Sequence, residues 1–434
     1  MSYAKKLFGL EKKGTYKVWS IEVYDNLVSG CDDQATAWIS ITHGKEGGKL
    51  TEQIETITIG KQGRTVTEQA VLQAEARVKK QLDKNYRFTK EELNDLPVLA
   101  MLAQDASGEL EKRIPKDVVE NGVITSDKFD GNRCLAKCSA PGVVELFSRT
   151  NQLLNIPHIA AELAMVMQPG QILDGEIYLH GYVLEDIQSA VGRTDTQKEI
   201  DKAQKKHDKV NAREPDMSVS DDTWFRDYEK TLYELKQAQL IHVIRPLLEF
   251  HVFDFVVPDT RFDDRLGLLT AWFTNVYLAD PDYGKFVKQV RYNIAYSYEE
   301  LYTQHSDAVD RGYEGLMIRI PEFFYESGKR SNGIWKLKAF IDAEFLIIDV
   351  LADKNDGAIY WMQNNKDNIF GDREEFGCIM GTEIEKAYAL ENKGEFIGKW
   401  ITVQYQSRFK KSMLPQFPTG KMIREVDYDG NPVM

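Results

Sequence analysis

Several features that would place this 434-residue chain in a specialised class are missing from its sequence. Four cysteines are too few for a disulfide framework, and Cys134 with Cys138 lacks the second pair that a structural zinc site needs. No run of 18 apolar residues occurs, and the charged start, Met1 to Lys13, lacks the apolar core of a signal peptide. We therefore expect no membrane span, an intracellular location and four buried free thiols, at Cys31, Cys134, Cys138 and Cys378.

Two common nucleotide-binding fingerprints are also missing. The chain contains neither the G-x-x-x-x-G-K-[ST] loop of P-loop ATPases nor the Rossmann glycine pattern. The net charge of -13 argues, taken alone, against a nucleic-acid partner, because phosphate backbones are bound through Lys and Arg clusters. Between Lys393 and Arg424, however, seven residues are basic and one is acidic. A local polyanion-binding surface near the C-terminus is therefore compatible with the acidic total.

The length and the patterning predict an α+β protein of three domains. At this length several cores are expected, and 42% hydrophobic with 11% aromatic residues describe an ordered chain. Residues 1–90 show strand-like alternation followed by a helical pattern. The second domain, residues 91–341, begins with a mixed segment at 91–120 that suggests a linker, and strands and helices interleave from 123 to about 341. A charged helical insertion is expected at 196–240, and short strands that fit a small closed barrel are expected at 342–434.

The segment patterns give specific expectations for strands and helices. Strands are predicted at 16–24, 37–42, 55–59, 344–351, 357–362 and 400–405, and helices are predicted at 67–82 and 156–167.

The most informative stretch is the K-x-D-G-x-R pattern that runs from Lys128 to Arg133, just after the apolar pair Val123 and Ile124. By itself the pattern is weak, because a lysine on a loop is usually only solvated. Four further segments follow it in order: Leu173-Asp174-Gly175-Glu176, His251-Val252-Phe253-Asp254-Phe255, Tyr313-Glu314-Gly315-Leu316-Met317-Ile318-Arg319 and Trp335-Lys336-Leu337-Lys338. Five ordered matches are far more specific than one.

Together these segments resemble the motif series of the covalent nucleotidyltransferase superfamily, whose members are ATP-dependent DNA ligases, RNA ligases and mRNA capping enzymes. The resemblance spans about residues 95–430 and is closest to the DNA ligases. It implies an adenylation (nucleotidyltransferase) domain built of antiparallel sheets, a C-terminal OB-fold β-barrel after it, and a small α+β domain before it.

The resemblance also implies roles for individual residues. Lys128 corresponds to the nucleophile that attacks the α-phosphorus of ATP and carries AMP. Lys336 and Lys338, two apart on one strand, correspond to the lysines that bind phosphate oxygens. Glu314 looks like the metal-binding carboxylate, while Glu176 resembles a second metal ligand or the acceptor of a ribose hydrogen bond.

Further matches concern the adenine and the nick. Phe253 corresponds to the aromatic residue that stacks on adenine, and Arg133 and Arg149 correspond to arginines that contact the 5'-phosphate. Asp130 is expected to help organise the nick and the ribose. Ser126 stands where such ligases often have a glutamate that contacts the adenine amino group, which puts that contact in doubt.

The two ends of the chain carry weaker resemblances. The basic stretch from Lys410 to Arg424 resembles the end of the ligase barrel, which implies contacts with the DNA backbone and, at Arg424, with pyrophosphate. Near the N-terminus, His43 and Lys45 replace the Trp and Arg of a WGR signature. With the basic end of the following helix, this implies a nucleic-acid-binding domain at residues 1–90, although a plain structural role is equally compatible.

The function implied by the resemblance is that of an ATP-dependent DNA ligase which seals nicks in double-stranded DNA, with ATP and Mg²⁺, as a monomer. Such an enzyme suits DNA repair and replication in a bacterium or a virus. The alternatives are an RNA ligase, a capping-type guanylyltransferase, or a nucleic-acid-binding protein whose catalytic motifs have decayed.

Overall fold

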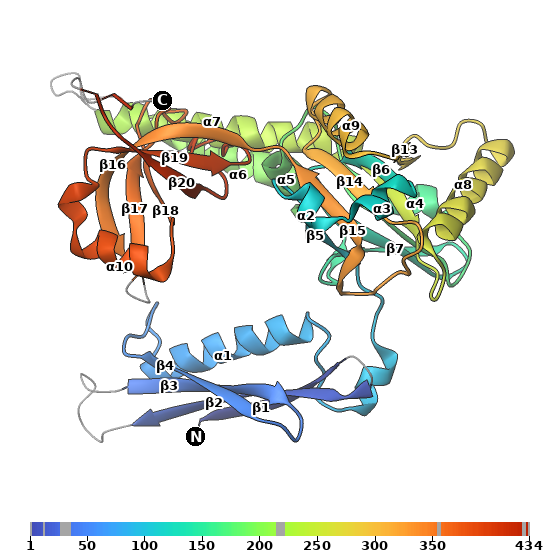
Figure 1. Cartoon of the computed structure of the whole chain (residues 1–434), viewed down its shortest axis with the longest axis horizontal. Coiled ribbons are helices and arrows are strands. Elements are labelled where there is room, and N and C mark those ends of the chain that lie inside the picture. The colour runs from blue at the N-terminus through green and yellow to red at the C-terminus, as the bar shows by residue number, and fades with distance from the viewer. Residues whose placement is uncertain are drawn as a thin grey trace. The chain divides into compact units, whose positions relative to one another are not determined.

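The computed structural model describes residues 2–11, 14–26, 36–213, 222–353, 357–427 and 431–432. The chain divides into two compact units, of which the first comprises Met1–Met101, Phe147–Leu153 and Glu326–Lys329 and the second comprises the other residues. Both units combine helices with mostly antiparallel sheets (Figure 1), so the α+β class is confirmed. No described helix is long and apolar enough to cross a membrane.

The N-terminal part of the first unit is a four-stranded antiparallel meander with one helix packed on it. Apolar residues of the strands, such as Ile21 and Ile39, alternate inward against Ala70 and Ala74 of the helix. A capping box of Thr65 and Glu68 fixes where the helix begins. The elements are β1 (Tyr3–Leu10), β2 (Tyr16–Asn26), β3 (Thr36–Lys45), β4 (Leu50–Ile57) and α1 (Val66–Leu82).

The predicted strands at 16–24 and 37–42 and the helix at 67–82 are confirmed by β2, β3 and α1. The strand expected at 55–59 begins earlier, at Leu50, because seven of the eight side chains of β4 are exposed and its alternation carries no burial signal. Strand β1 was not predicted, since its first half is polar and exposed at the sheet edge.

A six-stranded sheet forms one layer of the second unit, in the order β12-β11-β10-β7-β8-β9. Its buried face carries Cys134, Leu173 and Phe250, against which the helices α4, α5 and α8 place residues such as Leu163 and Phe273. The strands are β7 (Asn132–Ala140), β8 (Val143–Ser148), β9 (Leu153–Leu154), β10 (Ile172–Tyr178), β11 (Glu249–Phe255) and β12 (Val287–Gln289), and the helices are α4 (Pro157–Ala164), α5 (Leu184–Gly192) and α8 (Phe262–Ala279).

A five-stranded sheet, ordered β13-β6-β14-β15-β5, faces a second core that includes Val123, Leu316 and Leu337. Short helices α2 and α3 and the longer α9 accompany it (Figure 1). The strands are β5 (Leu102–Asp105), β6 (Val123–Lys128), β13 (Asn293–Ala295), β14 (Gly315–Arg319) and β15 (Arg330–Lys338), and the helices are α2 (Leu110–Arg113), α3 (Lys116–Glu120) and α9 (Tyr298–Asp310).

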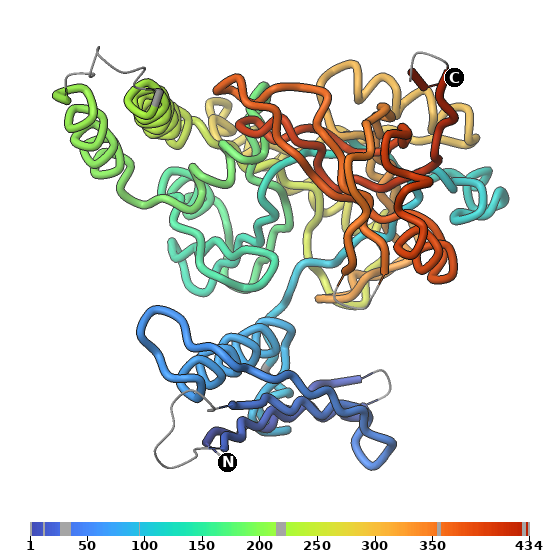
Figure 2. Tube along the Cα trace, turned by 90° about the vertical axis from the view of Figure 1, so that its left-hand side faces the viewer, coloured from blue at the N-terminus to red at the C-terminus, as the bar shows by residue number. Residues whose placement is uncertain are grey.

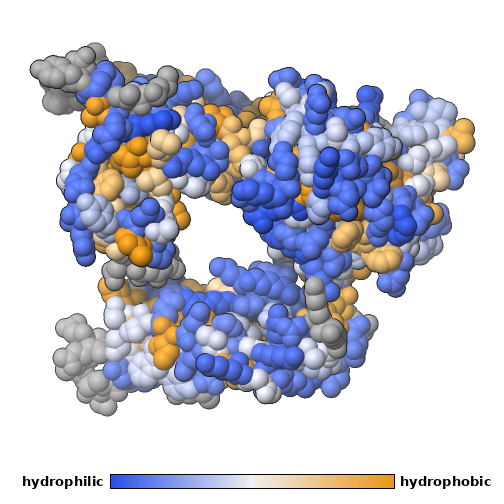
Figure 3. All heavy atoms as spheres, in the orientation of Figure 1, coloured by the Kyte–Doolittle hydropathy of each residue, from blue (hydrophilic) through white to orange (hydrophobic). Residues whose placement is uncertain are grey.

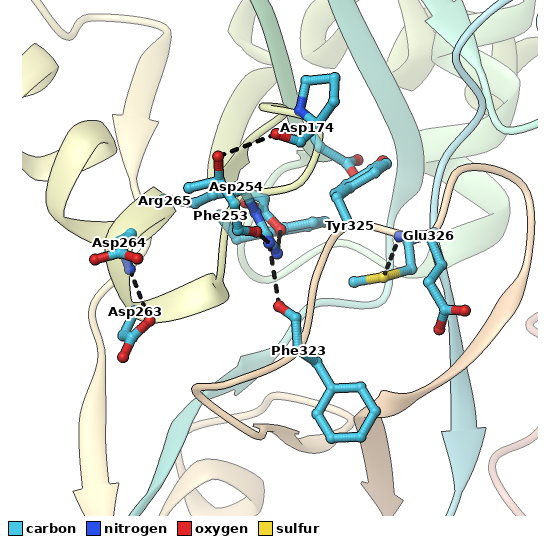
Figure 4. A network of polar contacts seen from close by, with 12 residues as sticks. Asp174, Phe253, Asp254, Asp263, Asp264, Arg265, Phe323, Tyr325 and Glu326 are labelled. Atoms are coloured by element: carbon cyan, nitrogen blue, oxygen red, sulfur yellow. Dashed lines mark hydrogen bonds and ion pairs between the residues drawn. The ribbon is translucent and has the colours of Figure 1, made fainter.

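A buried ion pair ties β11 to α8. Arg265 donates to both carboxylate oxygens of Asp254, at 2.8 and 3.0 Å, and to the carbonyl oxygens of Thr260 and Phe323. Figure 4 shows Asp254 and the carbonyl oxygen of Phe323 next to the guanidinium group. The two charged side chains are almost fully buried, at 0% and 3% exposed, and their mutual hydrogen bonds offset the cost of that burial.

The predicted insertion between β10 and β11 is helical, as expected. It forms α6 (Thr196–Asn211) and α7 (Asp222–Ile244), which lie side by side, as Figure 2 shows. Trp224 stacks on Tyr228 at 5.3 Å between ring centroids, and a hydrogen bond of 3.0 Å joins His207 to Thr231. Residues 214–221 of the insertion lie outside the described residues.

The C-terminal strands form a barrel. They pair in the order β18-β17-β16-β19-β20, and a bridge between Ile379 and Thr419 joins the two outer strands. Helix α10 (Glu383–Glu391) lies between the third and fourth strands in the sequence, as in an OB-fold. The strands are β16 (Ile341–Ala352), β17 (Ala358–Gln363), β18 (Glu375–Cys378), β19 (Trp400–Tyr405) and β20 (Thr419–Arg424). The three strands predicted here match β16, β17 and β19.

Of the four cysteines, Cys134, Cys138 and Cys378 are buried and none of them forms a disulfide, as expected. Cys31 lies outside the described residues.

Candidate active site

Three neighbouring strand ends bring the predicted nucleophile to its partners. Gly315 of β14 pairs with Lys128 at the end of β6 on one side and with Lys338 at the end of β15 on the other. Glu314 precedes Gly315, and its backbone N–H donates to the carbonyl oxygen of Lys128 at 3.0 Å. Residues 128, 314 and 338, far apart in the sequence, therefore meet at one edge of the sheet.

Glu314 holds both lysines with its single carboxylate. One oxygen pairs with Lys128 Nζ and the other lies 2.7 Å from Lys338 Nζ. Burial opposes ionisation of this carboxyl, but the two ammonium groups outweigh burial and hold the pKa of Glu314 below its ordinary value. The site therefore places two cations around one anion.

Asp130 faces the same carboxylate from the loop after Lys128. Burial, followed by the neighbouring charge of Glu314, raises the pKa of Asp130 to about 6. Two carboxylates in this position repel each other, and a bound cation would relieve the repulsion. The described residues contain no group of three or more metal-ligating side chains. Mg²⁺ needs only one or two carboxylates when phosphates and waters complete its shell, so this pair fits it.

The glycines of two motifs are required by close backbone approach. A Cβ on Gly131 would lie 2.3 Å from the carbonyl oxygen of Ile177 and 2.9 Å from Glu176 Cγ. At Gly315, φ is +148° and a Cβ would lie 2.1 Å from the carbonyl oxygen of Leu337. These contacts explain why both loops need glycine next to a functional side chain.

Arg133 is held by a residue that the sequence analysis quoted but did not select. Its guanidinium forms a bidentate pair with buried Asp174, at 2.6 and 2.7 Å, and Tyr325 donates to the same carboxylate at 2.6 Å. An acid on an apolar strand, as in Leu173-Asp174, is a signal for such a pair, because Asp is rarely buried unless paired. Asp174 thus fixes the arginine next to the site.

Glu176 lies across from Arg133 on the neighbouring strand β10. Burial raises the pKa of Glu176 to about 7, against the opposing influence of Arg133 and Lys128. Its carboxyl is therefore close to half-protonated at neutral pH in this form of the protein, and a cationic or hydrogen-bonding ligand would favour the charged state.

Phe253 occupies a β-bulge in β11, opposite the step from Asp174 to Gly175. The Arg133 guanidinium carbon lies 4.3 Å from the ring centroid of Phe253, and that of Arg319 lies at 5.1 Å. A base that stacks on this ring must share it with these guanidinium groups or displace one of them. The adenine-stacking role of Phe253 stays a prediction.

Ser126, the position at which the chain departs from the family pattern, accepts a hydrogen bond from Arg319 at 2.9 Å. Arg319 is 2% exposed, and its Nε has no hydrogen-bond partner among the described residues. The sequence analysis assigned no role to Arg319, and its place at the end of a hydrophobic strand gave no separate signal.

Two of the remaining predicted residues, Lys336 and Arg149, form no hydrogen bond or ion pair with Lys128, Glu314 or Lys338 among the described residues. Lys336 shares a strand face with Lys338 but pairs with Asp105 at 3.2 Å. Arg149 is exposed in the turn between β8 and β9. Their side chains therefore do not belong to the ion-pair cluster of Lys128.

The basic C-terminal stretch makes internal contacts in this structure. Lys410 pairs with Asp186 of α5 at 2.9 Å, and Arg424 pairs with Glu344 of the barrel at 3.2 Å. Lys338 donates to Gln406 at 3.0 Å. The two basic side chains predicted to contact DNA or pyrophosphate are thus neutralised within the chain in this conformation.

Comparisons with known proteins give a consistent result. Residues 100–338 match the family model of the ATP-dependent DNA ligase domain. The chain is 25% identical over 366 residues to a DNA ligase of Archaeoglobus fulgidus, an alignment that covers 80% of this chain and 57% of the relative. The chain therefore spans little more than half the length of that protein.

Two solved structures, Pmar-Lig_PreS3 and Pmar-Lig_Pre, resemble the chain with a TM-score of 0.54 each, at 18% and 19% identity. Each match covers 76% of this chain and 68% of the other. At this identity the likeness shows the fold alone.

Proposed function

The chain belongs to the ATP-dependent DNA ligase family, and we propose that it seals nicks in duplex DNA by way of an AMP group carried on Lys128. The observation that supports the proposal is the meeting of Lys128, Glu314 and Lys338 at adjoining strand ends.

In the first step the Lys128 amine attacks the α-phosphorus of ATP. A P–N bond forms, the bond to the bridging oxygen breaks, and pyrophosphate leaves with the electron pair. A free lysine has a pKa of about 10.4, so Nζ must give up a proton before attack. The positive charge of Lys338 and of a bound cation favours the neutral amine, and the proton passes to solvent. Lys338, freed from Glu314 by the incoming phosphates, then faces their oxygens.

Asp130 and Glu314 are the residues that would hold Mg²⁺ in this site. When bound, the ion supplies charge neutralisation at the transferring phosphate oxygens. Glu176 is proposed as the acceptor of a ribose hydroxyl or a further metal contact, Phe253 as the adenine stack, and Lys336 as a phosphate ligand.

Two transfers complete the reaction. The 5'-phosphate of the nick attacks the AMP phosphorus and Lys128 leaves, after which the 3'-hydroxyl attacks the activated phosphate and AMP leaves. Arg133 and Arg149 are proposed to bind the 5'-phosphate, since a planar guanidinium suits bidentate contacts with phosphate. Asp174 would keep Arg133 oriented for this contact.

We propose one role for each of three domains along the chain. Residues 91–341 form the adenylation domain, residues 342–434 form the OB-fold barrel, and residues 1–90 form a nucleic-acid-binding domain. We propose that the chain acts as a monomer, inside the cell where ATP and nicked DNA occur, in repair or replication.

The test is incubation with ATP labelled at the α-phosphate and Mg²⁺, followed by addition of nicked duplex. We expect the protein to take up label and the DNA to discharge it as the nick is sealed. Lys128→Ala should take up none. Lys137→Ala is the matched control, because Lys137 is also a partly buried lysine, on the next strand β7, and its loss should leave labelling intact.

The other outcomes separate the alternatives. Discharge by RNA ends only would make the chain an RNA ligase, and labelling from GTP would make it a capping-type enzyme. If no nucleotide becomes attached, the chain is a binding protein and the proposal is wrong.

A further inference from the structure

We propose that the N-terminal unit carries a second DNA contact, a basic groove that holds the phosphodiester backbone of the duplex without reading its bases. The proposal rests on the proposed function in taking DNA as the ligand. The groove is a cavity of about 600 Å³ between the sheet and α1. Its charged lining consists of Lys17, Lys45, Arg77, Lys80 and Lys84, and no acidic residue lines it.

The sheet side of the groove places like charges directly opposite each other. Lys17 of β2 and Lys45 of β3 are cross-strand partners in the register. Like charges in this position destabilise a sheet. Lys17 is partly neutralised by Glu11 at 3.5 Å, but Lys45 forms no ion pair within the described part of the chain. An anion in the groove would remove this repulsion.

The wall of the groove formed by α1 and the turn after it also carries clustered basic side chains. Arg77 and Lys80 are three residues apart on α1, a spacing that brings side chains together on one helix face. Lys84 follows two residues after the helix ends at Leu82 and also lines the groove. Arg77 pairs with Glu55, whereas Lys80 and Lys84 form no ion pair with any described residue. Along α1 the space-filling view is mostly hydrophilic (Figure 3). Two opposing walls therefore offer uncompensated positive charge.

The floor of the groove favours a backbone over unstacked bases. Single-strand-binding grooves combine cations with exposed aromatic rings on which bases stack. Two aromatic residues line the groove here: Trp19 is 5% exposed and belongs to the core of the unit, and Tyr86 is half-buried and packs against that core. The accessible polar groups, His43, Gln53 and Gln81, can donate to phosphate oxygens. The groove thus offers phosphate ligands and little for a base.

The net charge of residues 1–90 also favours binding of a polyanion. Residues 1–90 contain 15 basic and 11 acidic residues, whereas the rest of the chain contains 40 basic and 57 acidic residues. A polyanion is attracted to this region in a chain that otherwise repels it.

The test compares two double variants of the full chain. Lys80→Ala/Lys84→Ala removes two groove cations, and Lys61→Ala/Lys79→Ala removes two exposed lysines of the same unit that do not line the groove. Lys79 also lies in the last turn of α1, so a role limited to the helix dipole would affect both pairs. Thermal unfolding verifies that each variant is folded.

Binding of a nicked duplex, an intact duplex and single-stranded DNA is measured by fluorescence anisotropy from 50 to 300 mM salt, and the salt slope is the readout. For the groove variant we expect about tenfold weaker binding to both duplexes and a salt slope smaller by about 2, one for each lost phosphate contact. Lys80→Arg/Lys84→Arg should restore both quantities, and the Lys61/Lys79 variant should resemble the parent.

Equal losses in both double variants, or no loss in the groove variant, would overturn the proposal. A loss confined to single-stranded DNA would overturn the assignment to a duplex backbone. Failure of the parent to take up AMP would instead contradict the ligase proposal, and the binding comparison would remain readable in that case.

Discussion

The carboxylate of Glu314 lies 2.7 Å from Lys338 Nζ while its other oxygen pairs with Lys128, so one acid fixes two cations on either side of it. Glu314→Gln keeps the shape of the side chain and removes this charge. We expect lysyl-AMP formation to slow by about 100-fold or more, because the two lysines lose the charge that positions them, and misplaced reacting groups can cost about this factor. Time courses with α-labelled ATP measure the rate.

Glu299→Gln is the control for this substitution, because Glu299 is an exposed glutamate on α9. It should label at the parental rate. Equal rates for Glu314→Gln and the parent would show that neither metal binding nor lysine positioning depends on this carboxylate.

Gly131→Ala should also slow lysyl-AMP formation, because it displaces the backbone that carries Lys128. The new Cβ would lie 2.3 Å from the carbonyl oxygen of Ile177, so the loop that carries Lys128 and Asp130 must shift. We expect a loss of about 1–3 kcal/mol in stability from the strain, and little labelling even where the variant is folded by circular dichroism. Full labelling by a folded variant would contradict the close approach.

Gly267→Ala is the matched control. Gly267 is exposed in α8, and a Cβ there meets nothing within 4 Å. Alanine should raise stability by up to about 1 kcal/mol, because glycine is the poorer helix former.

The sequence was sufficient to predict the residue types of the site but not how they are connected. Lys128, Glu314 and Lys338 could each be selected because their segments resemble the motifs of the covalent nucleotidyltransferases. Their meeting depends on the pairing of β6, β14 and β15, whose register links residues nearly two hundred positions apart. Nothing local in the sequence specifies that register.

The residues that the sequence analysis missed have partners from distant segments. Asp174 pairs with Arg133 on another strand, and Arg319 donates a hydrogen bond to Ser126. The bulge at Phe253 likewise reflects a mismatch between β10 and β11. In the N-terminal sheet, β1 was not predicted and β4 was predicted only in part. Both are edge strands whose mostly exposed side chains show little alternation.

The buried pair of Arg265 and Asp254 should dominate the stability of the second unit. Arg265→Met would leave the Asp254 carboxylate and two carbonyl oxygens without their donor in a site where the acid is 3% exposed. We expect a loss of about 3–5 kcal/mol, the cost of an uncompensated buried charge. The urea midpoint of unfolding, followed by tryptophan fluorescence, measures it.

The same helix supplies the control. Arg261 pairs with Asp263 on the surface, at 2.7 Å, with both side chains well exposed. Arg261→Met should leave the urea midpoint nearly unchanged, because water and salt screen such pairs. Similar midpoints for the two variants would mean that burial does not set the strength of the pair.

Thiol reactivity offers a prediction with a defined pH dependence. Burial in the barrel raises the pKa of Cys378 to about 12. At pH 8 only about one thiol in 10⁴ is then ionised, against roughly a quarter for an ordinary cysteine of pKa about 8.5. Because the thiolate is the reactive form, the rate at Cys378 should rise about tenfold per pH unit up to pH 11, whereas an ordinary thiol levels off near pH 9.

The measurement uses Cys31→Ser protein, so that only cysteines of known environment remain, with Cys31→Ser/Cys378→Ser as its partner. With Ellman's reagent at pH 8, both native proteins should react negligibly within minutes, because Cys134 and Cys138 are also buried. After denaturation, three thiols should react in the first protein and two in the second. A fast native thiol present only in the first protein would show that the barrel admits solvent at Cys378, and the packing around it would then be looser than the structure indicates.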